Sequence, residues 1–194
     1  MGGDPHRRVS GACARDRTDL SLPLALAAGP ADATPATWSS AINLPDLGLA
    51  AVIGHGIPMN RLLLVDEPGE HLPEVVAALA PVCDVLLVRP HTWLQPRTTA
   101  RLAAHLRRTG SVLLSHGPWP DGAQLHLHIT AAAWSGLGSG YGQLLHRRVT
   151  VRASGRGSAS RPRTADLLLP DESGRVGVPM TGAGAQPVSG DVAV

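Results

Sequence analysis

The run Cys83-Asp84-Val85-Leu86-Leu87-Val88 constrains the fold of this chain more than any other segment. Uninterrupted apolar runs of this length are typical of strands that are buried on both faces, as in the interior of a parallel sheet. Parallel strands need long crossover connections, which are usually helices. Arg89 and Pro90 follow the run, so this strand ends in a cation and in a residue that cannot donate to a sheet. The segment therefore predicts an α/β protein with a cationic side chain where a buried strand ends.

The neighbouring segments alternate between strand and helix patterns, which favours a mostly parallel sheet flanked by helices. After residue 120 the pattern changes to longer strands separated by turns, which indicates antiparallel strands at the C-terminal edge of the sheet. Helices are expected over residues 20–28, 72–79 and 97–108, with another opened by Pro45 and closed at residues 54–56. Strands are expected over residues 38–44, 61–65, 83–88, 112–115, 125–133, 148–152 and 165–169.

The composition excludes some chemistry. All 17 basic residues are arginines, so catalysis that depends on a lysine amine is excluded. The formal net charge of +2 does not by itself indicate a nucleic-acid partner. Two cysteines are too few for a disulfide framework and fit a reducing compartment. The sequence shows neither a signal peptide nor an apolar run of about 20 residues that would span a membrane. We therefore expect a soluble, cytoplasmic protein.

The pattern divides the chain into one domain and two tails. Residues 18–170 carry the alternating elements and are expected to form a single α/β domain. Residues 1–17 are polar and rich in arginine, and residues 171–194 combine Gly, Pro, Ser and Val without any period. We expect both tails to be disordered, because neither offers an apolar face to bury.

The N-terminal tail contains part of a phosphate-binding pattern. In G-x-x-x-x-G-K-[ST] the glycines let the backbone wrap phosphates and the lysine contacts them. Gly11 and Thr18 match the pattern, whereas Asp16 replaces the second glycine and Arg17 replaces the lysine. Such a partial match arises readily by chance. What supports a functional interpretation is its position, just before an expected helix and the alternating strands and helices. We interpret it as a degenerate nucleotide-binding remnant.

Arginines gather in the second half of the chain, in the expected hairpin and its turn. Six cations on a flexible ribbon could contact phosphates, and each contact would add salt-dependent affinity for DNA. The alternative interpretation is an ordinary solvated hairpin with arginine as its surface cation. The candidate DNA-binding residues are Arg147, Arg148, Arg152, Arg156, Arg161 and Arg163.

Three further patterns indicate less. His126 and His128 would face the same way on a strand and could share a metal, but no third ligand has a suitable spacing, so no metal site is expected. Residues 136–142 are rich in glycine and are interpreted as a flexible loop. No nucleophile motif is present, and the adjacent pair Ser115-His116 lacks the geometry of a catalytic triad.

The order of these motifs resembles the RecA core. The resemblance rests on Trp38-Ser-Ser-Ala-Ile-Asn-Leu-Pro-Asp46, on His55-Gly-Ile-Pro-Met-Asn-Arg-Leu-Leu-Leu-Val65 and on Cys83-Asp-Val-Leu-Leu-Val-Arg-Pro90. It continues in the paired segments 147–152 and 165–169 and covers roughly residues 9–170. Within this superfamily, the Gly-rich tract from Trp134 to Gly142 and the following Arg-Arg-Val-Thr-Val are most similar to the short actinobacterial RecA-like proteins of the inducible mutagenesis cassette, the ImuA type.

This resemblance implies a RecA-like, P-loop NTPase-type core and a role in the DNA-damage response. Its implied partners in translesion synthesis are a Y-family polymerase homologue and an error-prone C-family replicase. The chain departs from the pattern at three places: Asp16 and Arg17 spoil the P-loop, Pro45 occupies the position of the water-activating glutamate, and Arg89 that of the metal-side aspartate. We therefore expect no ATP hydrolysis, no catalytic residue and no cofactor.

The hypothesis that follows is a non-catalytic RecA-fold accessory protein, which acts through protein contacts and binds DNA at most weakly. Two alternatives stay open. In the first, Arg17 takes the place of the usual lysine and the protein still binds ATP. In the second, the chain is a small arginine-rich DNA-binding module.

Overall fold

In the computed structural model, residues 12–14, 20–33, 37–91, 93–120, 123–137 and 142–179 are described. The strands are β1 (Ala12–Ala14), β2 (Ser39–Ile42), β3 (Leu62–Val65), β4 (Val85–Val88), β5 (Val112–His116), β6 (Leu125–Leu137), β7 (Gly142–Gly155) and β8 (Arg163–Leu168). The α-helices are α1 (Ser21–Ala33), α2 (Leu49–Gly54), α3 (Leu72–Leu79) and α4 (Pro96–Thr109). Short 3-10 turns cover Met59–Arg61, Gly69–His71 and Gly157–Ala159.

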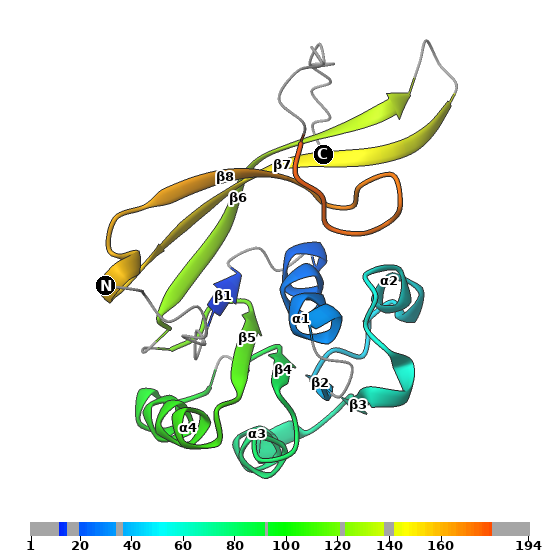
Figure 1. Ribbon diagram of the computed structural model, residues 1–194. Coiled ribbons are helices and arrows are strands. Elements are labelled where there is room, and N and C mark those ends of the chain that lie inside the picture. The colour runs from blue at the N-terminus through cyan, green and yellow to red at the C-terminus, as the bar shows by residue number, and fades with distance from the viewer. Residues whose placement is uncertain are drawn as a thin grey trace.

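The strands form one sheet in the order β3-β2-β4-β5-β1-β6-β7-β8. From β3 to β6 neighbouring strands are parallel, whereas β7 and β8 continue the sheet in antiparallel pairing. Figure 1 shows helices on both sides of the parallel part and the long strands β6, β7 and β8 curving away from it. The expected α/β architecture, with antiparallel strands at the C-terminal edge, is confirmed.

Strand β4 explains why both faces of the parallel sheet are covered. All four of its residues are buried. Val85 and Leu87 pack into the cluster on the α1 side, while Leu86 and Val88 pack into the cluster formed with α3 and α4. Since successive side chains of a strand point to opposite faces, a continuous apolar run is what a sheet with helices on both faces requires.

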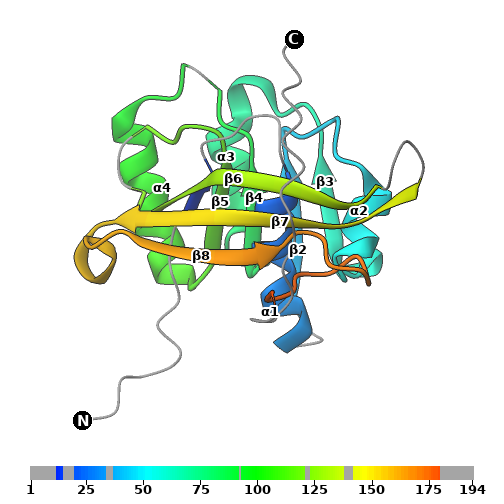
Figure 2. The same cartoon turned by 90° about the horizontal axis from the view of Figure 1, so that it is seen from above.

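Helix α1 lies inside the curve of the sheet. Its residues Leu22, Leu24, Ala27 and Ala28 are buried in one cluster with Val149 and Val151 of β7, among others. In Figure 1 the strands β6 to β8 arch over this helix, and Figure 2 shows these three strands side by side in front of the parallel part. The antiparallel strands therefore complete the core around α1.

Helices α3 and α4 follow their sequence signals closely. Helix α3 has the expected bounds, and α4 begins at Pro96, whose missing N–H costs nothing in a first turn. Gly110 ends α4 in the left-handed conformation, with φ 78°, and its N–H donates to the Leu106 carbonyl. The buried stripe of α4 consists of Thr99, Leu102 and Leu106.

Helices α1 and α2 differ from their expected bounds. Helix α1 does not end before Gly29 but continues through Pro30 to Ala33. Pro45 does not open α2, because residues 44–47 form a turn in which the Leu47 N–H donates to the Leu44 carbonyl at 3.0 Å. Helix α2 instead begins at Leu49, after Gly48. Proline fits the second position of such a turn as well as the start of a helix.

Both expected tails contain ordered residues. Residues 12–14, expected in a disordered segment, form β1 between β5 and β6, with Ala12 level with Leu114 on one side and Leu125 on the other. Residues 171–177, also expected to be disordered, turn back so that Leu168 and Gly177 exchange two backbone hydrogen bonds. Local hydrogen bonding by Asp171 holds this turn: its Oδ1 accepts from the Ser173 N–H at 2.8 Å and from the Arg175 N–H at 2.9 Å.

In the described part of the chain, no helix has the length and apolar character needed to cross a membrane.

Candidate functional site

The carboxyl ends of the parallel strands meet at one edge of the sheet, where open α/β sheets usually bind ligands. The pairing register sets Ile42, Val88 and Ser115 level with one another across β2, β4 and β5. Asn43 follows Ile42, Arg89 follows Val88, and His116 follows Ser115. These three residues, which come from distant parts of the sequence, form a row across the carboxyl edge.

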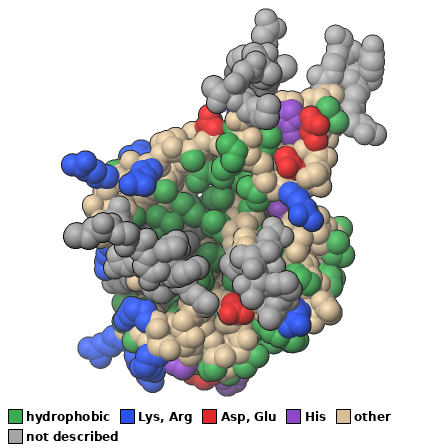
Figure 3. Space-filling model, viewed as in Figure 1, with side chains coloured by type: hydrophobic (Ala, Val, Ile, Leu, Met, Phe, Trp, Pro, Cys, Tyr) green, Lys and Arg blue, Asp and Glu red, His purple; other side chains and the backbone are tan. Residues whose placement is uncertain are grey.

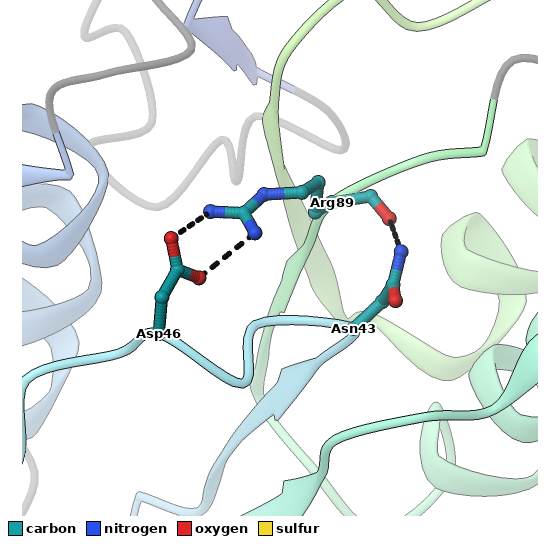
Figure 4. A network of polar contacts seen from close by, with 3 residues as sticks. All are labelled: Asn43, Asp46 and Arg89. Atoms are coloured by element: carbon teal, nitrogen blue, oxygen red, sulfur yellow. Dashed lines mark hydrogen bonds and ion pairs between the residues drawn. The ribbon is translucent and has the colours of Figure 1, made fainter.

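Arg89 does not extend into solvent alone, because Asp46 pairs with it. The two guanidinium nitrogens Nη1 and Nη2 approach the two carboxylate oxygens of Asp46 at 2.8 and 2.9 Å. Figure 4 shows this two-pronged contact between the end of β4 and the loop that follows β2. A planar guanidinium and a carboxylate match in this geometry, so the pair fixes both side chains more firmly than a single contact would.

Asn43 sets the path of the loop that brings Asp46 to Arg89. Its backbone has a φ of 60°, a left-handed conformation that asparagine adopts more readily than most residues. Its side-chain amide donates to the Arg89 carbonyl at 2.9 Å, and its backbone N–H donates to the Val65 carbonyl at 2.8 Å. The loop after β2 is thus hydrogen-bonded to both neighbouring strands.

The pairing determines what Asp46 can do chemically. Its hydrogen bond with Arg89 lowers the pKa of the Asp46 carboxyl below its ordinary value, and the opposing effect of burial is smaller. A carboxylate with a lowered pKa is a weaker base. At the carboxyl edge, Arg89 and Asp46 therefore form a paired cation and anion.

We expect the Arg89→Gln substitution to raise the pKa of the Asp46 carboxyl toward the ordinary value of an aspartate, because it removes the hydrogen bond that lowers this pKa. Because the folded-state pKa of Asp46 is lowered, its contribution to stability is present above the unfolded pKa and is lost as pH falls through the folded value. A carbon-detected NMR titration of the side-chain carboxyl measures the shift. Asp171 is the internal control, since the pKa of its carboxyl is lowered mainly by Ser173. An unchanged Asp46 titration would contradict the pairing.

Sequence reasoning missed the aromatic side chains beside this edge. The rings of His91 and Trp93 stack with their centroids 5.3 Å apart, and Trp93 is 44% exposed. It also missed Asp46 as the partner of Arg89, although a carboxylate after a Pro at the end of an expected strand could have suggested it. On β5, Ser115 and His116 are both buried, and the Ser115 hydroxyl donates to the Gly117 carbonyl at 3.0 Å.

The degenerate P-loop is only partly covered by the structure. Gly11, Asp16, Arg17 and Thr18 lie outside the described residues, so their arrangement stays a prediction. The residues that would form the loop after Gly11 include Ala12–Ala14, and these belong to β1. In the phosphate-binding pattern the loop follows a strand. The sequence between β1 and α1, residues 15–20, contains no glycine.

The six arginines of the hairpin do not form one surface. Arg147 lies on the same side of β7 as the buried Val149 and Val151, so it faces the body of the protein. Its guanidinium lies 5.9 Å from the centre of the Trp134 ring and its Nη1 donates to the Ser21 hydroxyl at 3.4 Å. Arg147 is thus part of the contact between the hairpin and α1.

The other five arginines are exposed and fall into two groups. Arg148 and Arg152 lie on the outer face of β7, about 13 Å apart at the usual rise of a strand. Between them, Thr150 donates to Asp166 of β8 at 2.8 Å, so a carboxylate interrupts this row of cations. Arg156, Arg161 and Arg163 lie where β7 turns into β8. In Figure 3, basic side chains lie along the left side of the molecule, where Figure 1 shows this turn.

The two histidines of β6 lie opposite residues of β7. His126 is level with Ser154 and His128 with Arg152 in the pairing of β6 with β7. Over the described residues, no group of three or more His, Cys, Asp or Glu side chains could hold a metal ion.

The strand order and the helices on both faces of the sheet define an α/β fold. A solved structure titled as that of the RadB recombinase matches it with a TM-score of 0.59 and 6% sequence identity, covering 88% of this chain and 91% of that chain. At so low an identity the likeness shows the fold alone.

The chain belongs to the family described as the MT3502 N-terminal domain, whose model matches residues 3–121. This match includes β1 to β5 with all four α-helices and ends before β6. The comparison with curated proteins gave no match. The likeness to the RadB structure confirms the RecA-like fold, and the closer resemblance to the ImuA type stays a prediction.

Proposed function

We propose that this protein is a non-catalytic RecA-fold accessory protein of DNA-damage tolerance, which acts through contacts with other proteins. The observation that carries the non-catalytic part is the Arg89–Asp46 pair at the carboxyl edge of the sheet. Nucleotide hydrolysis needs an anchored metal ion and a group that positions water there. The residue that follows β4 is the cation Arg89, and the neighbouring carboxylate, that of Asp46, is paired with it.

The assignment to DNA-damage tolerance rests on the RecA-like fold together with the resemblance of the motifs to the ImuA type. Fold alone does not determine function. The partners that this proposal names are a Y-family polymerase homologue and an error-prone C-family replicase. Its test is the association of the purified protein with each of them by size-exclusion chromatography. Co-elution with at least one is expected, and separate elution from both would overturn the assignment.

The non-catalytic part predicts that ATP and magnesium leave the melting temperature unchanged, within about 1 °C. A site whose Kd is 100-fold below the ATP concentration would stabilise the protein by about 2.7 kcal/mol. For a protein of this size that corresponds to roughly 5–10 °C. A titration by differential scanning fluorimetry, with magnesium alone as the control, measures the shift. A saturable rise that requires ATP would favour the alternative in which a nucleotide is still bound.

A second candidate function, direct DNA binding, is favoured by the exposed Arg148 and Arg152 on the outer face of β7. If these two contact phosphates, replacing both by Gln should weaken DNA binding uniformly across sequences and lower the salt slope by about 2. Fluorescence anisotropy with a labelled oligonucleotide at several salt concentrations measures both quantities. The control removes two exposed arginines of α4, Arg101 and Arg107. Equal losses in the two variants would indicate only the effect of net charge.

A further inference from the structure

Most of strand β6 has a neighbouring strand on one side only. It pairs with β7 along its whole length, Leu125–Leu137, whereas β1 accompanies it only over Leu125–Leu127. From residue 128 on, no described strand lies on that second side. Figure 1 shows the far end of the β6–β7 hairpin extending away from the helices. Residues 131–133 are exposed there and Trp134 is 48% exposed, so this free edge of β6 is open to solvent.

The register shows which backbone groups point to the free edge. Arg147 of β7 exchanges backbone hydrogen bonds with the segment that follows β8, so its N–H and C=O do not point to β6. Trp134 lies opposite Arg147, and Ala132 lies opposite Val149. Such opposite residues are the non-hydrogen-bonded pairs of an antiparallel ladder, and their backbone groups point away from the partner strand. The N–H and C=O of Ala132 and Trp134 therefore point to the free edge, where no described backbone group bonds to them.

This edge lacks the protections that natural sheets commonly use. An open row of N–H and C=O groups pairs readily with another chain, and charged side chains, proline or a very short strand usually prevent it. The outermost strands of the sheet have such protection, because β3 has only four residues and β8 carries Arg163 and Asp166. Residues 129–137 of β6, in contrast, contain no charged residue and no proline. The free edge of β6 is therefore suited to accept a further strand.

The free edge is complementary to a second copy of itself. Its pairing with β7 has two irregularities, and between them residues 131–135 are in regular register. A two-fold axis at Ala133 would set Ala132 of each copy opposite Trp134 of the other in an antiparallel pair. Each outward N–H would then meet an outward C=O of the second copy. Two alanines would face each other at the axis, and no like charges would oppose the contact.

We propose that two copies of this chain associate through residues 131–135, which we call the β6 edge, so that the β6 strands of the two copies pair antiparallel. The hairpins of both copies then form one continuous sheet across the two-fold axis. Because the contact is small, the dimer is weak, and its dissociation constant lies in the micromolar range. This inference goes beyond the proposed function and does not depend on it.

Sedimentation equilibrium of the full chain over a concentration series tests the dimer. We expect a reversible particle of twice the 20.1 kDa of one chain. Hydrogen exchange followed by NMR at low and high concentration locates the contact. The amides of Ala132 and Trp134 should exchange about tenfold more slowly when most chains are dimeric, whereas those of β8 should not change. A chain that stays a monomer up to about 1 mM, or a dimer that protects other residues instead, would overturn the proposal.

Ala132→Pro removes an N–H that points to the free edge and leaves the hydrogen bonds between β6 and β7 in place. We expect it to raise the dissociation constant of the dimer by at least about tenfold. The matched control is Thr164→Pro on β8. Its N–H also points away from the sheet, on the side where the Leu168 N–H, four residues on, bonds to Gly177. Circular dichroism checks that both variants fold. An unchanged dimer in Ala132→Pro, or the same loss in both variants, would count against the β6 edge.

A charge exchange tests the same contact without proline. Ala133→Arg places like charges opposite each other at the two-fold axis, where the strands are closest, and should weaken the dimer by at least about tenfold. A fluorescently labelled Ala133→Arg chain should regain association in an excess of unlabelled Ala133→Glu chain. It should stay a monomer in the same excess of unlabelled Ala133→Arg chain. If the Ala133→Glu chain restores no association, position 133 does not face itself across the axis and the proposal is wrong.

Discussion

Replacing Cys13 by proline is expected to lower the free energy of unfolding by about 2–4 kcal/mol, because it removes one ladder hydrogen bond and leaves its partner unpaired. Cys13 is the middle residue of β1, which is paired on both sides, with β5 at Ser115 and with β6 at His126. In a strand with two neighbours every backbone N–H points toward one of them. Proline is therefore tolerated at the edge of a sheet but not at this position.

The matched control is Cys13→Ala, which keeps the backbone N–H at the same position and should cost far less. Urea unfolding followed by circular dichroism measures both variants. Equal stabilities of the proline and alanine variants would mean that residues 12–14 do not contribute to the sheet in solution. A large loss in the proline variant alone would establish that the arginine-rich N-terminal segment contains part of the fold.

Truncating Leu86 to Ala is expected to lower the free energy of unfolding by about 3 kcal/mol, through lost burial and the cavity that remains. Leu86 is fully buried in the middle of β4, in the cluster that joins the sheet to α3 and α4. Because neighbours on both helices hold their positions, the surrounding side chains cannot close the space completely.

The control for this variant is Leu64→Ala on the edge strand β3. Leu64 is 44% exposed, so the same truncation should cost less than about 1 kcal/mol. Chemical denaturation of the two variants under the same conditions gives the difference. A loss at Leu86 no larger than that at Leu64 would contradict the assignment of Leu86 to the interior of a sheet covered on both faces.

The elements with strong local patterns were predictable from the sequence. Strand β4 has an apolar run that only a sheet covered on both faces explains, and α4 has an amphipathic pattern with Pro at its start and Gly at its end. Strand β1 could not be predicted, because three residues show no period and alanine has low strand propensity. Its place depends on two strands about 100 residues further along the chain.

The candidate site was predictable only in part. Arg89, the cation at the end of β4, could be identified from the run of apolar residues before it. Its pairing with Asp46 depends on the turn around Pro45, and in the sequence this proline fits the start of a helix equally well. The arginines of the hairpin lie close together in the sequence. Their division between two faces follows from the strand alternation, since Arg147 and Arg148 are adjacent and point opposite ways.

The central position of β1 also sets the order in which the chain can complete its sheet during synthesis. Residues 12–14 leave the ribosome well before their partners in β5 and β6, which follow after about 100 further residues. Until then the helices and strands in between can form local contacts, but β5 and β6 cannot be joined. The insertion of β1 between β5 and β6 therefore has a high contact order, and until it happens the facing edges of these two strands are open to intermolecular strand pairing.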